Sequence, residues 1–144
     1  MKAYTTRVGD GPFITEDTTE LGIKLQDSGK EFGSVTGRKR RCGWLDLPAL
    51  DHAIKMTGIK KVILTKVDIL ESLKHFFVCF GYDGKKPLFI KFDLWKTPIR
   101  EQILTNKLDT EFSEFIRYIK NYLSVKIQAV SYGPDSKDIS DFNG

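Results

Sequence analysis

A loop rich in glycine and basic residues, 31–41, carries the side chains best suited to bind an anion, and its sequence is EFGSVTGRKRR. Glycine lets the backbone approach a ligand closely or adopt positive φ. The guanidinium groups of Arg38 and Arg40 are forked donors that fit a carboxylate or a phosphate, and alternate residues of an extended loop project to the same side. Taken alone, a four-residue basic run is also typical of a solvated loop or a nucleic-acid patch, and both alternatives stay open.

A second candidate binding segment follows a short, mostly apolar run at 61–65, a pattern typical of a strand buried in a parallel sheet. Asp68 lies just past this predicted strand, where nucleotide-binding α/β folds place residues that read a base. A carboxylate can accept hydrogen bonds from both N1–H and the 2-amino group of guanine, while the stem of Lys66 lies along the ring. Adenine offers no such pair of donors and would leave the carboxylate unpaired. The same arrangement occurs in the Asn-Lys-x-Asp motif of GTP-binding proteins, although an isolated TKVD also fits an ordinary surface turn.

The segment 131–134, with the sequence SYGP, ends the last predicted strand. In a parallel sheet it would lie beside 65–68, with Ser131 and backbone amides facing the guanine base and its ribose. A Gly-Pro pair after a strand is also a simple strand terminator, so this segment alone does not establish a site.

The cysteines and histidines show no metal-ligand spacing. Cys42 and Cys79 lie far apart in the sequence. Neither His52 nor His75 has a carboxylate or nucleophile at a sequence spacing typical of a catalytic or metal site. We therefore expect no zinc site, and instead reduced, buried thiols in a cytoplasmic protein. Neither phosphate-binding glycine motif, G-x-x-x-x-G-K-[ST] or G-x-G-x-x-G, is present.

Positive charge is concentrated in one part of the chain. The net charge is +4, yet residues 36–61 alone carry +5, so the remainder is slightly acidic. A local basic excess suggests one anionic ligand rather than a polyanion bound over the whole surface. The 144 residues are 40% hydrophobic, with no long apolar run and no apolar stretch near the start. The sequence therefore predicts one domain without a membrane span or a signal peptide.

Strands and helices alternate along the chain and would position these segments. Strands are predicted at 2–8, 61–65, 76–82, 88–92 and 126–131, and helices at 45–57 and 110–123. Asp46 is expected to cap the first helix and Gly58 to end it, while 76–82 and 88–92 pair as a hairpin. Residues 14–36 lack a sustained period and predict a long loop, and the polar tail predicts a frayed edge. The alternation indicates an α/β fold with a mixed, mostly parallel sheet flanked by helices.

Taken together and in order, these segments resemble the adenylosuccinate synthetase family. The resemblance is carried by Lys2–Glu16, Glu31–Arg41, Gly43–Asp46, Leu64–Leu70 and Ser131–Asp135. Each segment is weak by itself, but the ordered set covers nearly the whole chain and is highly specific. The resemblance implies that residues 1–144 are the C-terminal region of a P-loop-NTPase-like adenylosuccinate synthetase fold.

The resemblance implies a ligase of purine (AMP) biosynthesis. Such an enzyme phosphorylates the 6-oxygen of IMP with GTP, L-aspartate then displaces the phosphate to give adenylosuccinate, and Mg²⁺ is required. The family is cytoplasmic and homodimeric. Its N-terminal part supplies the phosphate loop, the catalytic Asp and His, and most of the IMP and Mg²⁺ site, and no motif of that part is found here. We therefore expect no catalytic residue and no metal ligand in this region, and no activity from it alone.

The resemblance also implies binding roles, residue by residue. The aspartate and IMP site would comprise Ser34, Val35, Thr36, Gly37, Arg38, Lys39 and Arg40, of which Thr36, Arg38 and Arg40 would hold the substrate carboxylates. The GTP site would comprise Arg40, Lys66, Val67, Asp68, Ser131, Tyr132 and Gly133. Within these sets Arg38 would also reach IMP, and Arg40 would approach the GTP phosphates.

The sequence departs from the family pattern at several positions. Val35 stands where many members have Thr, Lys39 replaces an Arg, and Ser136 stands where Arg is common. The region 80–108 is shorter than in bacterial members, which resembles the short archaeal forms. Two other functions stay open: a stand-alone guanine-nucleotide or partner-binding module, and nucleic-acid binding through Arg38–Arg41.

Overall fold

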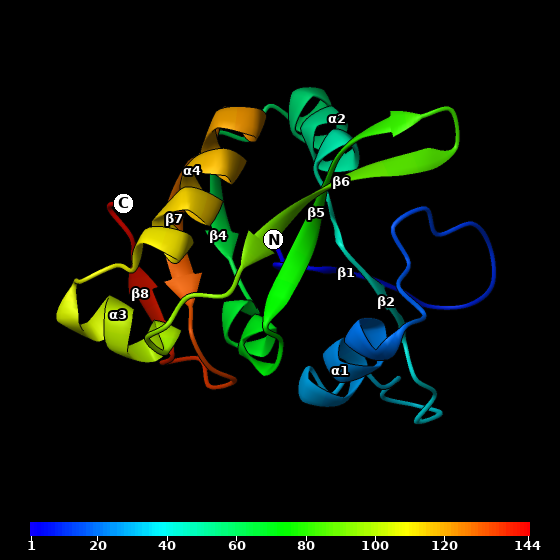
Figure 1. Cartoon of the computed structure of the whole chain (residues 1–144), viewed down its shortest axis with the longest axis horizontal. Helices are drawn as coiled ribbons and strands as arrows, with labels where there is room; N and C mark the ends of the chain where they lie inside the picture. Colours follow the sequence, from blue (N-terminus) through cyan, green and yellow to red (C-terminus); the bar gives the residue numbers. More distant parts are fainter.

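Three small sheets with helices packed beside them make up the computed structural model of the chain, which describes residues 1–144 (Figure 1). The strands are β1 (Thr5–Arg7) and β2 (Arg41–Gly43) in the first sheet, β3 (Leu45–Asp46), β5 (His75–Asp83) and β6 (Lys86–Asp93) in the second, and β4 (Lys61–Leu64), β7 (Lys126–Ser131) and β8 (Ile139–Asp141) in the third. The helices are α1 (Glu20–Ser28), α2 (Leu47–Thr57), α3 (Ile99–Thr105), α4 (Thr110–Leu123) and a 3₁₀ helix, η1 (Val67–Ser72). None of these helices has both the length and the apolar character needed to cross a bilayer.

The strand pairings confirm the mixed α/β class, but the expectation of a mostly parallel sheet is wrong, because three of the five strand pairings are antiparallel. β3 runs parallel to β5 and β4 runs parallel to β7, whereas β1–β2, β5–β6 and β7–β8 are antiparallel. α2 packs on β5 and α4, and α4 in turn packs on β6. The sequence predicts one sheet, whereas the strands are divided among three.

The strongest local signals in the sequence are confirmed. Helix α4 and strand β7 have the predicted bounds, and β5 and β6 form the predicted hairpin. Helix α2 begins after Asp46, whose carboxylate accepts a hydrogen bond from the Ala49 amide at 3.2 Å. It ends at Gly58, which takes a φ of 72°, the left-handed conformation that favours glycine.

The prediction of a loop over 14–36 is wrong for α1. Asp17 accepts a hydrogen bond from the Thr19 amide at 2.8 Å, and the Thr19 hydroxyl in turn accepts one from the Leu21 amide at 3.4 Å. Only Gly22 and Leu25 of the helix are buried, so no apolar stripe marks it in the sequence. The helix is therefore stabilised by capping and by its contact with η1 and β2.

Three further expectations are corrected at strand ends. The first strand is shorter than 2–8, because Val8 is 74% exposed and only Thr5–Arg7 pair with β2. β4 lies at the edge of its sheet with Ile63 at 41% exposure, whereas the apolar run suggested a buried strand. The tail is ordered by pairing: β8 adds to β7, and Phe142 is buried against the core.

An aromatic cluster between the β5–β6 hairpin and α4 forms the centre of the core. The ring of Phe115 lies 5.0 Å from that of Phe76 and 5.6 Å from that of Phe92, centroid to centroid. Trp95 and Phe112 extend the cluster, with ring centroids 5.1 Å apart. These contacts hold α4 on the hairpin and bring the start of α3 against the same core.

Replacing Phe115 by alanine is expected to lower the free energy of unfolding by about 3–5 kcal/mol, because a fully buried ring would leave a cavity. Urea denaturation followed by tryptophan fluorescence measures the change. Met56→Ala is the matched control, since Met56 is 75% exposed and should cost little. Similar losses in the two variants would contradict this description of the core.

Candidate functional site

The parallel pairing of β4 with β7 brings the two predicted base-binding segments to one edge of the third sheet. Leu64 is in register with Val130, so residues 65–68 and 131–135 leave the sheet at the same end. The crevice at the carboxyl ends of parallel strands is where α/β folds bind ligands. The sequence argument required this juxtaposition, and the structure provides it.

The Thr65–Asp68 side of this edge is a tight turn into η1. Lys66 takes a φ of 64°, and its ammonium donates a hydrogen bond to the carbonyl of Gly29 at 3.3 Å. Val67 is fully buried and anchors the turn. Asp68 is half-buried, and this burial raises the pKa of its carboxyl, while nearby backbone N–H groups and the Lys66 charge act in the opposite direction.

The 131–133 side is a loop that closes on itself. The Ser131 hydroxyl donates to the carbonyl of Gly133 at 3.2 Å, and Tyr132 is buried. A Cβ on Gly133 would overlap the carboxylate of Asp138, so only glycine fits there. The loop therefore has one well-defined shape at the edge shared with Asp68.

The loop 31–41 is a short, exposed hairpin. Phe32 and Lys39 form an isolated bridge, and the Gly33 amide donates to the carbonyl of Arg38 at 2.6 Å. Gly37 takes a φ of 67° at the tip and donates to the carbonyl of Gly33 at 2.9 Å. The stretch 34–39 is exposed, and Val35, which is 94% exposed, has no polar side-chain atom, so it could form hydrogen bonds to a ligand only through its backbone.

The basic side chains of this loop differ in their partners. Lys39 pairs with Asp27 at 3.5 Å, Arg40 with Glu31 at 3.0 Å, and Arg41 donates to both carboxylate oxygens of Glu16. Arg38 is exposed and forms no ion pair, so it is the cation of the loop most available to a ligand.

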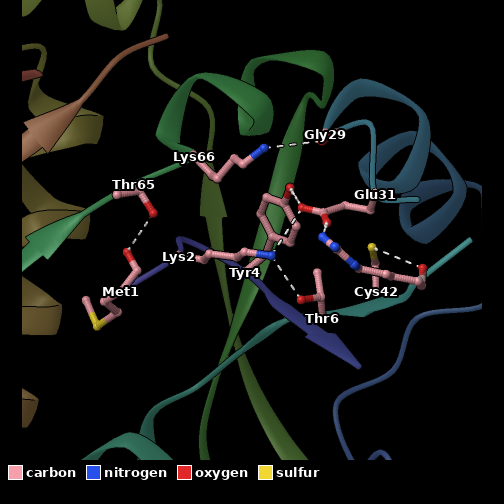
Figure 2. A network of polar contacts seen from close by, with 10 residues as sticks. Met1, Lys2, Tyr4, Thr6, Gly29, Glu31, Cys42, Thr65 and Lys66 are labelled. Carbon is pink, nitrogen blue, oxygen red and sulfur yellow. Dashed lines mark hydrogen bonds and ion pairs between the residues drawn. The ribbon is translucent and has the colours of Figure 1, made fainter. Parts of the chain in front are cut away.

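Glu31 is the residue that the sequence argument missed. Its buried carboxylate accepts hydrogen bonds from the Tyr4 hydroxyl at 2.7 Å, the Lys2 ammonium at 3.3 Å and the Arg40 guanidinium at 3.0 Å (Figure 2). Burial alone would raise the pKa of Glu31, but these donors and the charge of Lys2 together bring that pKa below its usual value. Burial and the neighbouring carboxylate raise the pKa of Tyr4.

This network lies between the two predicted binding segments. Arg40 enters it from the loop 31–41. Lys66 reaches the carbonyl of Gly29 in the same region (Figure 2). Two partners of Glu31, Lys2 and Tyr4, lie 29 and 27 residues away in the sequence, so no short motif could have revealed them. Only Arg40 lies in the same segment, nine residues after Glu31.

No metal site is formed by the acidic, cysteine and histidine side chains. No group of three or more of them lies close enough to hold an ion, so the donor set does not fit Mg²⁺, which prefers clustered oxygen ligands. Cys42 and Cys79 are buried and unpaired, as predicted, and burial raises the pKa of the Cys42 thiol to about 11.

Comparisons with known proteins agree with one another. The family model described as adenylosuccinate synthetase matches residues 1–140. Two curated proteins with that name are similar: one from Flavobacterium psychrophilum, 39% identical over 153 residues, and one from Hydrogenobaculum sp., 40% identical over 150 residues. Each match covers 95% of this chain, and the chain spans about 36% of the length of these relatives.

A solved structure is also similar, that of fully ligated adenylosuccinate synthetase from Plasmodium falciparum. It superposes with a TM-score of 0.87 at 31% identity, over 99% of this chain and 38% of that one. The relatives named here are not archaeal, so a special likeness to the short archaeal forms stays a prediction.

Glu31→Gln is expected to destabilise the chain by about 1–3 kcal/mol at neutral pH, because Arg40 and Lys2 would lose a charged acceptor. A carboxyl whose pKa is lowered by folding stabilises above its unfolded value of 4.5, and this contribution disappears as pH falls through the lower, folded value. The difference between wild type and variant should therefore shrink in acid.

Urea denaturation at neutral and acidic pH measures this difference. Asp27→Asn is the matched control, because it removes a carboxylate from an exposed ion pair and should change little. A Glu31→Gln variant as stable as wild type at neutral pH would contradict the role given to the network.

Proposed function

The chain belongs to the adenylosuccinate synthetase family, and from that premise we propose that its residues recognise the guanine base of GTP and hold L-aspartate for the ligase reaction. The chain spans about 36% of the length of its curated relatives, so the activity of the whole enzyme is part of this proposal. The observation that carries it is the shared edge at which Asp68 and the 131–133 loop meet.

Guanine recognition would rest mainly on Asp68. An ionised carboxylate at this edge can accept from N1–H and from the 2-amino group of guanine, two donors that adenine lacks. The ammonium of Lys66 is already anchored on Gly29, so the lysine stem is held in place beside the edge. Ser131, Tyr132 and Gly133 would close the other side of the base.

Aspartate binding would rest on the loop 31–41. Arg38 offers an exposed guanidinium, and Thr36 a hydroxyl that already accepts from the Arg38 amide at 3.3 Å. Arg40 uses one Nη atom for Glu31 and keeps its other N–H donors for a carboxylate or phosphate. Ser34, Gly37 and Lys39 would frame the ligand, and Val35 would contribute backbone groups.

The reaction assigned to the family forms a phosphate ester on the 6-oxygen of IMP with GTP, and the amine of L-aspartate then displaces that phosphate. Residues 1–144 would bind and orient GTP and aspartate. The groups that activate IMP would lie in the part of the family's length that these residues do not cover, and so would the ligands of Mg²⁺, since no cluster here fits it. The cytoplasmic homodimer that the family implies belongs to the same proposal.

The ion pairs of the loop argue against the nucleic-acid alternative. Lys39, Arg40 and Arg41 each have an acidic partner, so the basic run presents much less free charge than its sequence suggests. A nucleic-acid interface depends on cations free to contact phosphates, and its affinity falls steeply with salt.

We expect the chain to bind GDP more tightly than ADP by about tenfold or more. The reason is that the charged acceptor, Asp68, would pair with guanine and would be left unpaired by adenine. Asp68→Asn should abolish this preference, because a neutral amide cannot accept from both guanine donors. Isothermal titration with GDP and ADP at one salt concentration measures it. Asp83→Asn, an exposed carboxylate in the β5–β6 hairpin, is the control and should keep it. Superimposable GDP and ADP curves for wild type would refute guanine recognition.

We also expect residues 1–144 alone to make no adenylosuccinate from IMP, GTP, Mg²⁺ and L-aspartate, because the groups that activate IMP in the family would lie outside them. The formation of adenylosuccinate, followed by its absorbance, is the measurement. Turnover above the no-enzyme rate, lost again in Arg38→Ala, would show that the chemistry lies within these residues.

A further inference from the structure

Helix α3 ties the two sides of the proposed base-binding edge together. Glu71 of η1, three residues after Asp68, accepts hydrogen bonds through one oxygen from the Ile99 amide at 2.7 Å and from the Trp95 indole at 3.2 Å. The start of α3 is therefore fixed on the 3₁₀ helix that carries Asp68. None of the sequence motifs includes this helix.

The next residue, Arg100, reaches the opposite side of the edge. Its guanidinium donates to one oxygen of Asp138 at 2.8 Å and lies over the Tyr132 ring, 5.2 Å from the ring centroid. The Asp138 side chain is 5% exposed, and Arg100 is its one ion-pair partner. A buried carboxylate that loses its cation is strongly unfavourable, so this pair is unlike the exposed ion pairs elsewhere on the surface.

Asp138 in turn determines the shape of the 131–135 loop. Its carbonyl accepts from the Tyr132 amide at 2.8 Å, and its amide donates to the carbonyl of Asp135 at 2.9 Å. Its second carboxylate oxygen accepts from the Asp135 amide at 3.2 Å and fills the space beside Gly133. The Arg100–Asp138 pair is therefore joined by hydrogen bonds to the backbone that would contact a base.

Asp138 also acts on Asp68 through its charge. The ionisable side chains that interact with the Asp68 carboxyl through their charge are Lys66, Asp138 and Tyr4. Burial raises the pKa of Asp68 most, Lys66 lowers it, and the Asp138 charge raises it further. Arg100 forms an ion pair with Asp138, and its positive charge offsets the negative charge of the Asp138 carboxylate.

We propose that Arg100 is a positioning residue for guanine recognition: by pairing with Asp138 it holds the 131–135 loop in the shape that would contact the base. The inference rests on the proposed guanine site and extends it to a residue of α3. It makes base selectivity depend on a side chain that belongs to neither base-binding segment.

The test compares the affinity for GDP with that for IDP, which lacks the 2-amino group. Titration calorimetry would use wild type, Arg100→Gln, Arg100→Lys, Asp138→Asn and the double variant Arg100→Gln/Asp138→Asn. We expect Arg100→Gln to lose most of the GDP-over-IDP preference, a change of about tenfold for one hydrogen bond to a charged acceptor. Arg100→Lys should retain much of it, and the double variant should regain it because the uncompensated charge is gone.

Arg117→Gln is the matched control, an exposed arginine on α4 that should change neither affinity. Thermal unfolding of every variant reports its folding. If Arg100→Gln weakens GDP and IDP equally, or leaves their ratio unchanged, the inference is wrong while guanine binding stands. If wild type itself shows no preference for GDP over ADP, the proposed function fails instead.

Discussion

The buried carboxylate of Glu31 imposes the strictest constraint on this chain, because a charge removed from water must be matched by cations and donors. Those donors come from distant segments: Lys2 and Tyr4 precede β1, and Arg40 lies near the end of the loop 31–41. Satisfying one carboxylate therefore determines how β1, the end of α1 and the loop meet. Lys66 donates to the carbonyl of Gly29 beside this network, so the loop 31–41 and the base-binding edge are held in place by the same part of the structure.

Carboxylates and cations occur on both sides of the base-binding edge. Arg100 forms an ion pair with Asp138, whereas the Lys66 ammonium donates to the carbonyl of Gly29 and acts on Asp68 only through its charge. This differs from the loop 31–41, where acidic partners compensate three of four basic residues and leave Arg38 free. The edge carries a half-buried carboxylate, Asp68, whose pKa is raised mainly by burial, whereas the loop presents a free cation.

The sequence predicted those elements whose stabilising interactions are local. The apolar stripe of α4, the Asp46 cap of α2 and the Gly58 stop all depend on residues a few positions apart, and each was found where expected. Helix α1 was not predicted because it buries only Gly22 and Leu25, which leaves no apolar stripe in the sequence. The structure of the polar tail was not predicted because β8 and Phe142 are ordered by distant partners, not by their own composition.

The candidate site, like the fold, was predicted from the sequence only in part. Motif order brought Asp68 and the 131–133 segment to attention, and the β4–β7 pairing places them at one edge, as a parallel sheet required. The charges around them could not be foreseen. Glu31 meets Lys2 and Tyr4, and Arg100 meets Asp138, through tertiary packing, and their spacing along the chain does not indicate those contacts.

The pairing of β4 with β7 also bears on the order in which the chain folds. The β5–β6 hairpin closes through a tight turn at Gly84 and needs only neighbouring residues, so it can form early during synthesis. The β4–β7 pairing must wait until Ser131 has left the ribosome, and it closes a long loop that already contains the hairpin and α4. The base-binding edge is thus among the last parts to assemble, and β4 stays unpaired on that side until it does.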